Sequence, residues 1–542
     1  MEFEASDQDE YDLEAIDARI ESTLRRLIRL RRQRNFLASP LLRLPTELVL
    51  KIFMHTIGSA GDHPPLLGDD NPSSSENDGP TLLVLTAICR QLREIGMAST
   101  QLWSTVDLTI PPIAELFLER CKYDPRTIVW SQSASERRST QGSLENPGMG
   151  VVWKKLKDCT FNNLRSIVFE GLPHEFAYRL SGVLRAAPII SNLDLSNTVA
   201  GINAKLPSLD NPIPNLSTLR LYNFSISWTS PLLRNLSHLT LDFDPSGLPD
   251  ERTSIQTFLT ALASCPNLET LYLSHAGPDL LSGRQDNCDV VVQLPRLREL
   301  SLEFRDPSRV GYILSHIGHP EFTELAVYVP ADANADLSET ISQVLPRRTV
   351  ETIQRSRRST ALTIHLDTES HFFTDTFFIC FQNRGSLGSR GNRALNLQVL
   401  PQLASKIVEV VGRDTITSLD LETWYKDLPY EMWEAFLHGL PRLERIRYDL
   451  LKGKAGMGLP DSFIFAFSRP FEDGLICPQL QDLELPSVVL AQHHSAAYLK
   501  GALAEREAHG RRLKRIGLSG DTTKVDDRLV LEPFRDLVDE VC

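Results

Sequence analysis

A six-residue pattern, with apolar residues at its first, fourth and sixth positions, recurs along most of the chain. Its clear copies are centred on Ile167, Leu193, Leu219, Leu239, Leu271, Leu300, Leu325, Leu419, Ile446, Leu483 and Ile516. Weaker copies lie near Leu362 and Leu395. With both weak copies counted, the average spacing is about 29 residues, a period typical of repeat proteins. The pattern therefore predicts an array of similar structural units.

A proline marks an internal boundary in many of these units. It stands two residues before the first apolar position as Pro188, Pro214, Pro266, Pro295, Pro320, Pro441 and Pro478. Proline cannot continue a helix, and it biases the preceding residue toward extended backbone. Several copies follow apolar residues at helical spacing, such as Ile255, Phe258 and Leu262. We therefore expect each unit to consist of a helix, a proline and a short strand.

Stacked units of this kind form a curved solenoid, an α/β fold with parallel strands on the concave face and helices outside. Alternation along the strand directs Leu219 and Leu221 into the core and leaves Arg220 and Tyr222 on the concave face. By the same count, polar and aromatic residues of this face are expected to bind a substrate protein. These candidates are Arg220, Tyr222, Asp242, Tyr272, Glu303, Tyr328, Glu422, Arg447 and Asp449. An α/β domain of another topology is the alternative.

Two short amphipathic helices are predicted before the repeats. Pro45 suits the first turn of a helix, and Leu48, Ile52 and Phe53 give that helix an apolar face. A second helix is predicted between residues 82 and 98. Its apolar stripe consists of Leu85, Ile88, Leu92 and Ile95. Two helices of this length are marginally stable unless they borrow apolar surface from a partner.

The order of residues in this region resembles the F-box, the helical module by which substrate receptors of SCF-type ubiquitin ligases hold the adaptor Skp1. The matching strings are Leu44-Pro45-Thr46-Glu47-Leu48, Ile52-Phe53, Ile88-Cys89-Arg90 and Leu102-Trp103. The chain departs from the family at Leu92, where a Trp is usual, and in an acidic insertion over residues 58–80. Two ordinary amphipathic helices of a bundle are the alternative.

The resemblance implies a set of partners. A Skp1-like adaptor would bind the F-box directly, and a cullin and a RING subunit would join through the adaptor. The residues implied to dock on Skp1 are Leu44, Pro45, Leu48, Ile52, Phe53, Ile88, Leu92, Leu102 and Trp103.

The repeats are similar to the leucine-rich-repeat subtype common in F-box proteins, as Cys265-Pro266-Asn267-Leu268 and Cys477-Pro478-Gln479-Leu480 illustrate. The resemblance covers residues 40–110 and 160–520. The expected domains are an N-terminal helix (1–38), the F-box (40–108), a linker (109–160), a repeat domain (161–520) with a degenerate or inserted region (331–400), and a C-terminal tail (521–542).

Apolar residues before the F-box follow alternating steps of three and four residues. They are Leu13, Ile16, Ile20, Leu27, Leu30 and Leu37, with Thr23 and Arg34 at the two remaining positions. This is a coiled-coil pattern of about four heptads. A dimerising helix and a helix folded back on its own chain are both open, because so short a stretch is marginally stable alone. The arginine cluster between residues 25 and 34 is more typical of a solvated helix face than of a nuclear-import signal.

Composition and charge narrow the function classes. A net charge of −13 argues against general nucleic-acid binding, which requires a basic face. No segment has the apolar length of a membrane span, and the acidic start has the wrong sign for a secretory signal. The eight cysteines are scattered without zinc-ligand spacing, so a reducing cytoplasm or nucleus is expected.

No motif supports an active site, a metal site or a cofactor. His316-Ile317-Gly318-His319 matches a nucleotide-binding string of aminoacyl-tRNA synthetases, yet it falls where the repeat expects a helix to end. His493-His494 lacks the spacing of zinc enzymes. We therefore expect a substrate-recognition subunit of an SCF-type E3 ubiquitin ligase, without its own catalysis. A repeat-based scaffold acting outside a ligase is the alternative, and an enzyme with a repeat-built pocket is the least favoured class.

Overall fold

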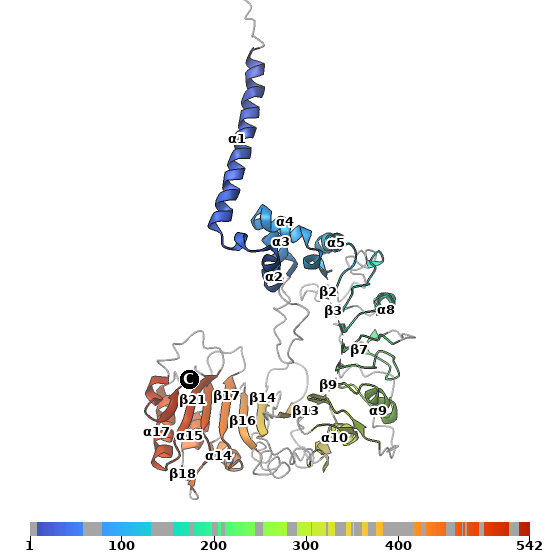
Figure 1. Cartoon of the computed structure of the whole chain (residues 1–542). Helices are drawn as coiled ribbons and strands as arrows, with labels where there is room; N and C mark the ends of the chain where they lie inside the picture. Colours follow the sequence, from blue (N-terminus) through green and yellow to red (C-terminus); the bar gives the residue numbers. More distant parts are fainter. Residues whose placement is uncertain are drawn as a thin grey trace, which may run out of the picture. The chain divides into compact units, whose positions relative to one another are not determined.

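The computed structural model divides the chain into two units. Unit 1 contains residues 1–169 and 186–190, and unit 2 contains residues 170–185 and 191–542. The residues described are 8–57, 78–131, 156–172, 177–197, 204–206, 212–243, 253–278, 290–304, 306–320, 324–330, 343–347, 349, 351, 360–366, 376–382, 416–423, 430–450, 461–468, 470–471, 474–486, 493–519 and 531–541. They form a mixed α/β protein in which most strand pairs are parallel (Figure 1).

Unit 1 begins with a long helix, α1 (Gln8–Ala38). The elements that follow are η1 (Leu41–Arg43), α2 (Thr46–Thr56), α3 (Asp78–Ile88), α4 (Arg90–Ala98), η3 (Thr100–Trp103), β1 (Thr105–Asp107), α5 (Pro111–Arg120), β2 (Thr127–Ser131) and β3 (Ser166–Glu170). We refer to residues 41–103 as the helical module. Residues 58–77, most of the predicted insertion, lie outside the described residues.

The helical module has a small core around Trp103. The indole Nε1 donates a hydrogen bond to the carbonyl of Gly96 at 2.9 Å, and the ring meets Phe117 edge-on with centroids 4.9 Å apart. Gly96 lets α3 and α4 approach closely, since a Cβ there would lie 2.7 Å from Cγ2 of Thr86. Phe53 completes the contact from α2, and its side chain is buried.

The prediction of one helix from 82 to 98 is wrong, because the helix is interrupted at Cys89. α3 ends at Ile88, Cys89 has extended backbone (φ −153°, ψ 165°), and α4 begins at Arg90. The guanidinium of Arg93 donates to the carbonyl of Thr86 at 3.0 Å, which satisfies an acceptor in the last turn of α3. The break changes which residues face inward, so Leu92 is buried whereas Ile88 is exposed.

The segment expected to be a linker, 109–160, contains folded structure. Helix α5 buries Ala114, Phe117 and Leu118. Strand β2 buries Ile128 and Trp130 and pairs in parallel with β1. Alternation of buried and half-buried residues in β2 is the pattern of a strand with one face on a core.

Unit 2 is built on strands in the order β4-β6-β8-β9-β11-β13-β15-β14-β16-β17-β20-β21-β22. The first six are β4 (Asn192–Ser196), β6 (Thr218–Tyr222), β8 (His238–Asp242), β9 (Thr270–Ser274), β11 (Glu299–Glu303) and β13 (Glu324–Pro330). The others are β14 (Thr360–Leu366), β15 (Thr376–Gln382), β16 (Ile416–Thr423), β17 (Arg445–Leu450), β20 (Asp482–Pro486), β21 (Leu513–Ser519) and β22 (Val538–Val541). Two-residue strands form three small pairs: β5 (Ala204–Lys205) with β7 (Phe224–Ser225), β10 (Val292–Gln293) with β12 (Ile317–Gly318), and β18 (Pro470–Phe471) with β19 (Gly474–Leu475).

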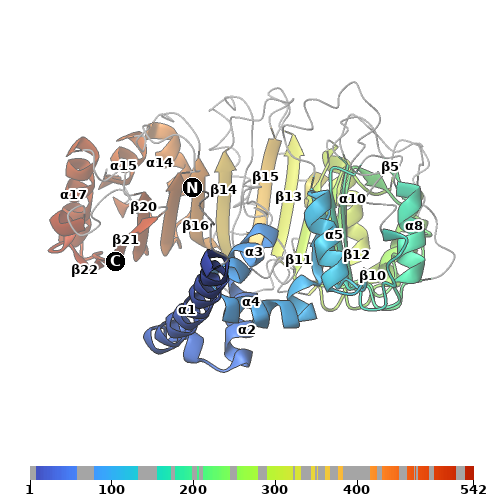
Figure 2. The ribbon, with the colours of Figure 1, turned by 90° about the horizontal axis from the view of Figure 1, so that it is seen from above.

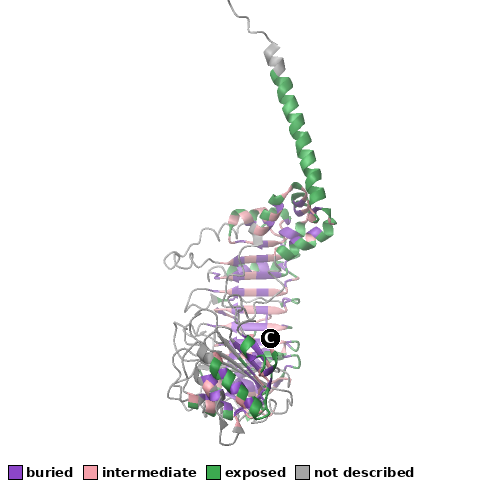
Figure 3. Ribbon diagram, turned by 90° about the vertical axis from the view of Figure 1, so that its left-hand side faces the viewer, coloured by how far each residue is buried: buried purple, intermediate pink, exposed green. Residues whose placement is uncertain are grey.

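The repeated leucines occupy one register across the parallel strands. In β4 to β13 the matching core residues are Leu193, Leu219, Leu239, Leu271, Leu300 and Leu325. All are buried, as are Leu219 and Leu221 of β6, so the predicted alternation is confirmed there. Buried positions alternate with more exposed ones in β4, β6 and β11, whereas β8 and β9 also bury Thr240, Tyr272 and Ser274 (Figure 3).

Helices of unit 2 pack their apolar faces into the same core. They are α8 (Ala177–Ala186), α9 (Ile255–Ala263), α10 (Pro307–His316), α14 (Tyr430–His438), α15 (Asp461–Ser468) and α17 (His493–Ala508), with a short turn η6 (Glu532–Phe534). Ser254 caps α9 by accepting from the Thr257 amide at 3.2 Å, and Asp306 caps α10 in the same manner. The helix expected from Ile255, Phe258 and Leu262 is confirmed as α9, and α14 likewise lies directly before Pro441, as expected for the repeat unit.

The region expected to be degenerate or inserted, 331–400, contains two described strands. β14 corresponds to the weak copy at Leu362, whereas β15 was not predicted. β15 lies between β13 and β14 and is antiparallel to both (Figure 2). The weak copy at Leu395 lies outside the described residues. The expected C-terminal tail adds β22 to the sheet, in parallel with β21. Among the described residues, no helix combines the length and apolar content needed to cross a bilayer.

Candidate functional site

The predicted Skp1-docking residues separate into two groups in the helical module. Phe53, Leu92, Leu102 and Trp103 are buried, with at most 6% of each side chain exposed. They form the module's own core, and their burial leaves little of their surface for direct contact with a partner. The remaining residues reach the surface: Pro45, Leu48, Ile52 and Ile88 are exposed, and Leu44 is half-buried.

The exposed apolar residues lie in pairs one helical turn apart. On α2, Leu48 is 43% and Ile52 is 39% exposed. On α3, Val84 is 63% and Ile88 is 62% exposed. Val84 was missed, although its spacing of four from Ile88 places both on one face of a helix. Each helix thus presents an apolar pair to solvent.

Local structure holds the α2 pair outward. Val49 and Phe53, each one residue after Leu48 and Ile52, are buried, and a step of one residue turns the helix by about 100°. Pro45 directly precedes α2, and its carbonyl accepts from the Leu48 amide at 3.0 Å. The side chain of Gln91 on α4 donates to the carbonyl of Leu42 at 3.0 Å, which ties the segment before α2 to the module.

The polar face of the unit 2 sheet is the second candidate surface. At its start, Arg220 on β6 lies beside Asp194 on β4, with Nη1 and Oδ2 3.6 Å apart. Burial raises the pKa of Asp194 to about 6, against the opposing charge of Arg220. Burial likewise raises the pKa of Tyr222 to about 12. Both charged side chains are largely buried, since Arg220 is only 14% and Asp194 only 17% exposed.

Tyr272 and Glu303 are joined on this face by a hydrogen bond. The Tyr272 hydroxyl donates to Oε2 of Glu303 at 3.0 Å, across the pairing of β9 with β11. Asp242 on β8 is the register neighbour of Tyr222 and is half-buried. Register also places Tyr328 beside Glu303. The predicted residues of β6 to β13 therefore lie on adjacent strands, as expected, but Tyr272 is buried, at 7% exposed, and offers little surface to a partner.

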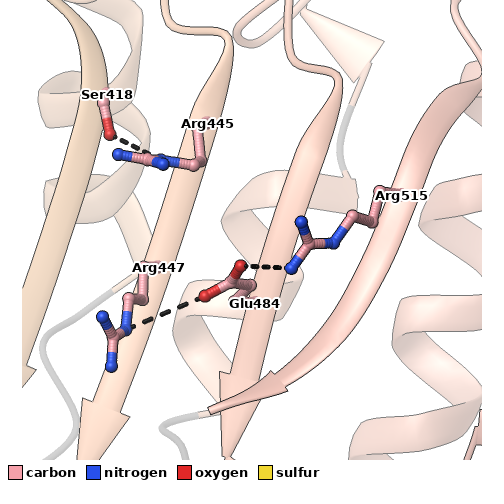
Figure 4. Close-up of polar contacts among 5 residues, drawn as sticks. All are labelled: Ser418, Arg445, Arg447, Glu484 and Arg515. Atoms are coloured by element: carbon pink, nitrogen blue, oxygen red, sulfur yellow. Dashed lines mark hydrogen bonds and ion pairs between the residues drawn. The ribbon is translucent and has the colours of Figure 1, made fainter. Parts of the chain in front are cut away.

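A second polar cluster lies on β16, β17, β20 and β21 (Figure 4). Glu484 stands between two arginines: Arg515 donates to its Oε1 at 2.8 Å, and Nε of Arg447 lies 3.8 Å from its Oε2. Arg445 donates to Oγ of Ser418 at 2.9 Å. Both arginine side chains remain partly accessible, since that of Arg447 is 49% and that of Arg515 is 41% exposed.

Of this cluster only Arg447 was predicted. Glu484 follows Leu483 as Arg220 follows Leu219, so the rule that identified Arg220 also identifies Glu484. Register places Glu422 next to Asp449 on the neighbouring strand. The side chains of Tyr328, Glu422 and Asp449 lie outside what the structure describes.

The motif at residues 316–319 and the cysteines were the remaining candidates for chemical activity. His316 is the last residue of α10, and Ile317 and Gly318 form β12, which agrees with the helix end expected there. Within the described part of the chain, no three His, Cys, Asp or Glu side chains gather in a way that would hold a metal ion. The cysteines 89, 121, 159, 265 and 477 are free thiols.

Neither a comparison with protein-family models nor a search of curated proteins finds a match for this sequence.

Proposed function

We propose that this chain is the substrate-recognition subunit of an SCF-type E3 ubiquitin ligase. In this proposal the helical module binds a Skp1-like adaptor, which brings a cullin and a RING subunit. The polar strand face of unit 2 binds the substrate protein. The complex acts in the cytoplasm or the nucleus, and the chain itself forms no bond and needs no cofactor.

One observation carries the proposal. The helices that hold the F-box-like residue order also leave Leu48, Ile52, Val84 and Ile88 exposed. A module this small gains little by exposing four large aliphatic side chains, whereas a partner that covers them completes the module's apolar packing. The buried residues of the same signature, Phe53 and Trp103, then serve to hold α2 and α4 in place.

The proposal includes a leucine-rich-repeat solenoid for unit 2, with the strands on the concave face. Support comes from the parallel pairing of β4, β6, β8, β9, β11 and β13 at one constant register. Further support comes from α9, which lies between β8 and β9 in the chain, and from α10, which lies between β11 and β13. A substrate held on such a face acquires a high effective concentration near the ubiquitin-charged enzyme, which is the whole catalytic contribution of a receptor.

The test is co-purification of the full chain with a Skp1-like adaptor. We expect Leu48→Glu together with Ile52→Glu to weaken adaptor binding by at least about 100-fold, because both side chains sit at the centre of the proposed interface. Met54→Glu is the matched control. Met54 is equally exposed on α2 but lies about 200° around the helix from Ile52, so binding is expected to persist.

Three outcomes are informative. The proposal is supported if the adaptor co-purifies with the wild type and with Met54→Glu but not with the Leu48→Glu and Ile52→Glu variant. Equal recovery of adaptor with all variants contradicts it. Adaptor recovered without any cullin would support instead a scaffold that uses the module outside a ligase.

A further inference from the structure

Helix α1 presents an apolar stripe that the rest of unit 1 does not cover. Every residue from 13 to 38 is exposed, and Figure 3 shows the helix exposed along this length. Its large apolar side chains are between 42% and 73% exposed. They are Leu13, Ile16, Ile20, Leu24, Leu27, Ile28, Leu30, Phe36 and Leu37. An isolated helix of this length gains little stability from its own backbone, so a partner must cover the stripe for the helix to persist.

The stripe follows the heptad seam, and a second α1 has the same length and spacing. Seam residues Leu13, Ile20, Leu27 and Arg34 alternate with Ile16, Thr23, Leu30 and Leu37. A repeat of seven residues keeps such a seam facing a partner helix along its whole length. A second copy of this chain therefore fits the stripe by geometry.

The charge along α1 selects the orientation of the partner. Residues 8–22 contain six carboxylates and one arginine, and residues 23–38 contain six arginines and no carboxylate. A parallel pair places the arginine-rich half of one helix beside the arginine-rich half of the other, and the like charges of neighbouring helices repel. An antiparallel pair sets each arginine-rich half against the acidic half of the other helix. Charge complementarity therefore favours the antiparallel arrangement.

The polar seam residues agree with this orientation. With the helices antiparallel and centred on Arg25, Leu13 lies opposite Leu37, Arg34 lies opposite Ile16, and Thr23 lies opposite Leu27. In a parallel pair Arg34 meets Arg34 inside the seam, where two charges are costly. The flanks agree as well. The antiparallel pair brings Asp17 beside Arg31 of the second copy, whereas the parallel pair brings Arg26 beside Arg31.

We propose that α1 pairs with α1 of a second copy of this chain as an antiparallel coiled coil. The proposal does not depend on the proposed ligase function, because it uses only residues of α1. It makes the chain a dimer in which each copy carries its own helical module and its own unit 2.

The first test is the mass of the full chain by sedimentation at micromolar concentration. We expect a dimer, and we expect Ile20→Asp with Leu27→Asp to convert it to a monomer. Phe36→Asp is the matched control, because Phe36 is as exposed as the seam residues but lies on the opposite side of α1, and this variant should stay dimeric. A monomeric wild-type chain at tens of micromolar would overturn the proposal.

The second test determines the orientation of the two helices from whether one substitution raises or lowers the dimer dissociation constant. In the antiparallel pair Arg31→Asp breaks both contacts with Asp17, so the dimer dissociation constant should rise by at least tenfold. In a parallel pair the same change removes the repulsion from Arg26 and tightens the dimer. The exchange of both residues, Asp17→Arg with Arg31→Asp, should restore the wild-type dissociation constant. Arg32→Asp, on the outer face, controls for the loss of charge alone, and tightening by Arg31→Asp would refute the antiparallel pair.

Discussion

The helical module and the first strands of unit 2 use apolar residues in opposite ways. In β4 to β13 the described strand leucines are all buried. In the module the apolar signature is divided, with Phe53 and Trp103 inside and Leu48 and Ile88 outside. A strand has two faces, so alternation assigns each residue to the core or to solvent. A helix has a continuous circumference, and one helix can pack inward on one arc and leave a second apolar arc for a partner.

This difference predicts how each region responds to loss of a buried contact. A module of about 60 residues has a free energy of unfolding of only a few kcal/mol, so the loss of one buried contact can unfold it. Unit 2 has a far larger core, so the loss of one contact removes a smaller share of its stability.

The largest effect is expected from Trp103→Ala. It removes a fully buried ring and the hydrogen bond to Gly96, and such changes cost about 3–5 kcal/mol. That is comparable to the whole stability of the module, so amide protons of α3 and α4 should lose their protection from hydrogen exchange. Protection in β6 and β8 should stay unchanged. Retained protection in α4 would mean that the module draws its stability from elsewhere.

Arg506→Ala should have the next largest effect, confined to unit 2. The buried guanidinium donates to the carbonyls of Ile476 and Cys477 at 2.8 and 2.7 Å, and Cys477 has a positive φ of 48°. Each carbonyl left unsatisfied costs about 1–3 kcal/mol, so we expect a loss of about 3 kcal/mol in chemical denaturation. Lys500→Ala, on the exposed side of the same helix, should cost less than about 0.5 kcal/mol. Equal effects of the two variants would contradict this role.

Asp194→Asn should have an effect that depends on pH, with the smallest difference in stability from wild type at about pH 4. The pKa of Asp194 is raised from 3.8 to about 6 by burial, so between these values the folded chain holds a proton that the unfolded chain has released. Wild-type stability should therefore fall, relative to the variant, as pH rises from about 4 to 6, by up to about 3 kcal/mol. Above about pH 6 the difference should be constant. Parallel stability curves for the two proteins across this window would show that Asp194 titrates normally.

Most strands of unit 2 could be predicted from the sequence because each copy of the repeat has the same spacing of apolar residues. Leucines three and two residues apart after a proline mark β4, β6 and β9 at their observed register. β15 was missed because its run Phe377-Phe378-Ile379-Cys380-Phe381 lacks that spacing, although five consecutive apolar residues are typical of a buried strand.

The exposed apolar residues of the helical module could be predicted only in part. The apolar stripe through Ile88 and Leu92 continues across Cys89 without a glycine or proline, so nothing local marks the break between α3 and α4. Helical periodicity shows that residues share a face, yet it does not distinguish a face that meets the same chain from one that meets another. That distinction required the packing of Trp103 and Phe53, which depends on contacts between segments distant in sequence.

The antiparallel strand β15 is the sole bridge between two runs of parallel strands among those described. It shares six register positions with β13 but only three with β14, whereas β14 shares seven with β16. The seam between β15 and β14 is consequently among the shortest in the hydrogen-bonded ladder, with the β17–β20 and β21–β22 seams. Opening it would create two unpaired strand edges, which are the surfaces on which foreign strands add and proteins aggregate. Truncation within residues 376–382 should therefore promote aggregation of this chain by exposing the edges of β13 and β14.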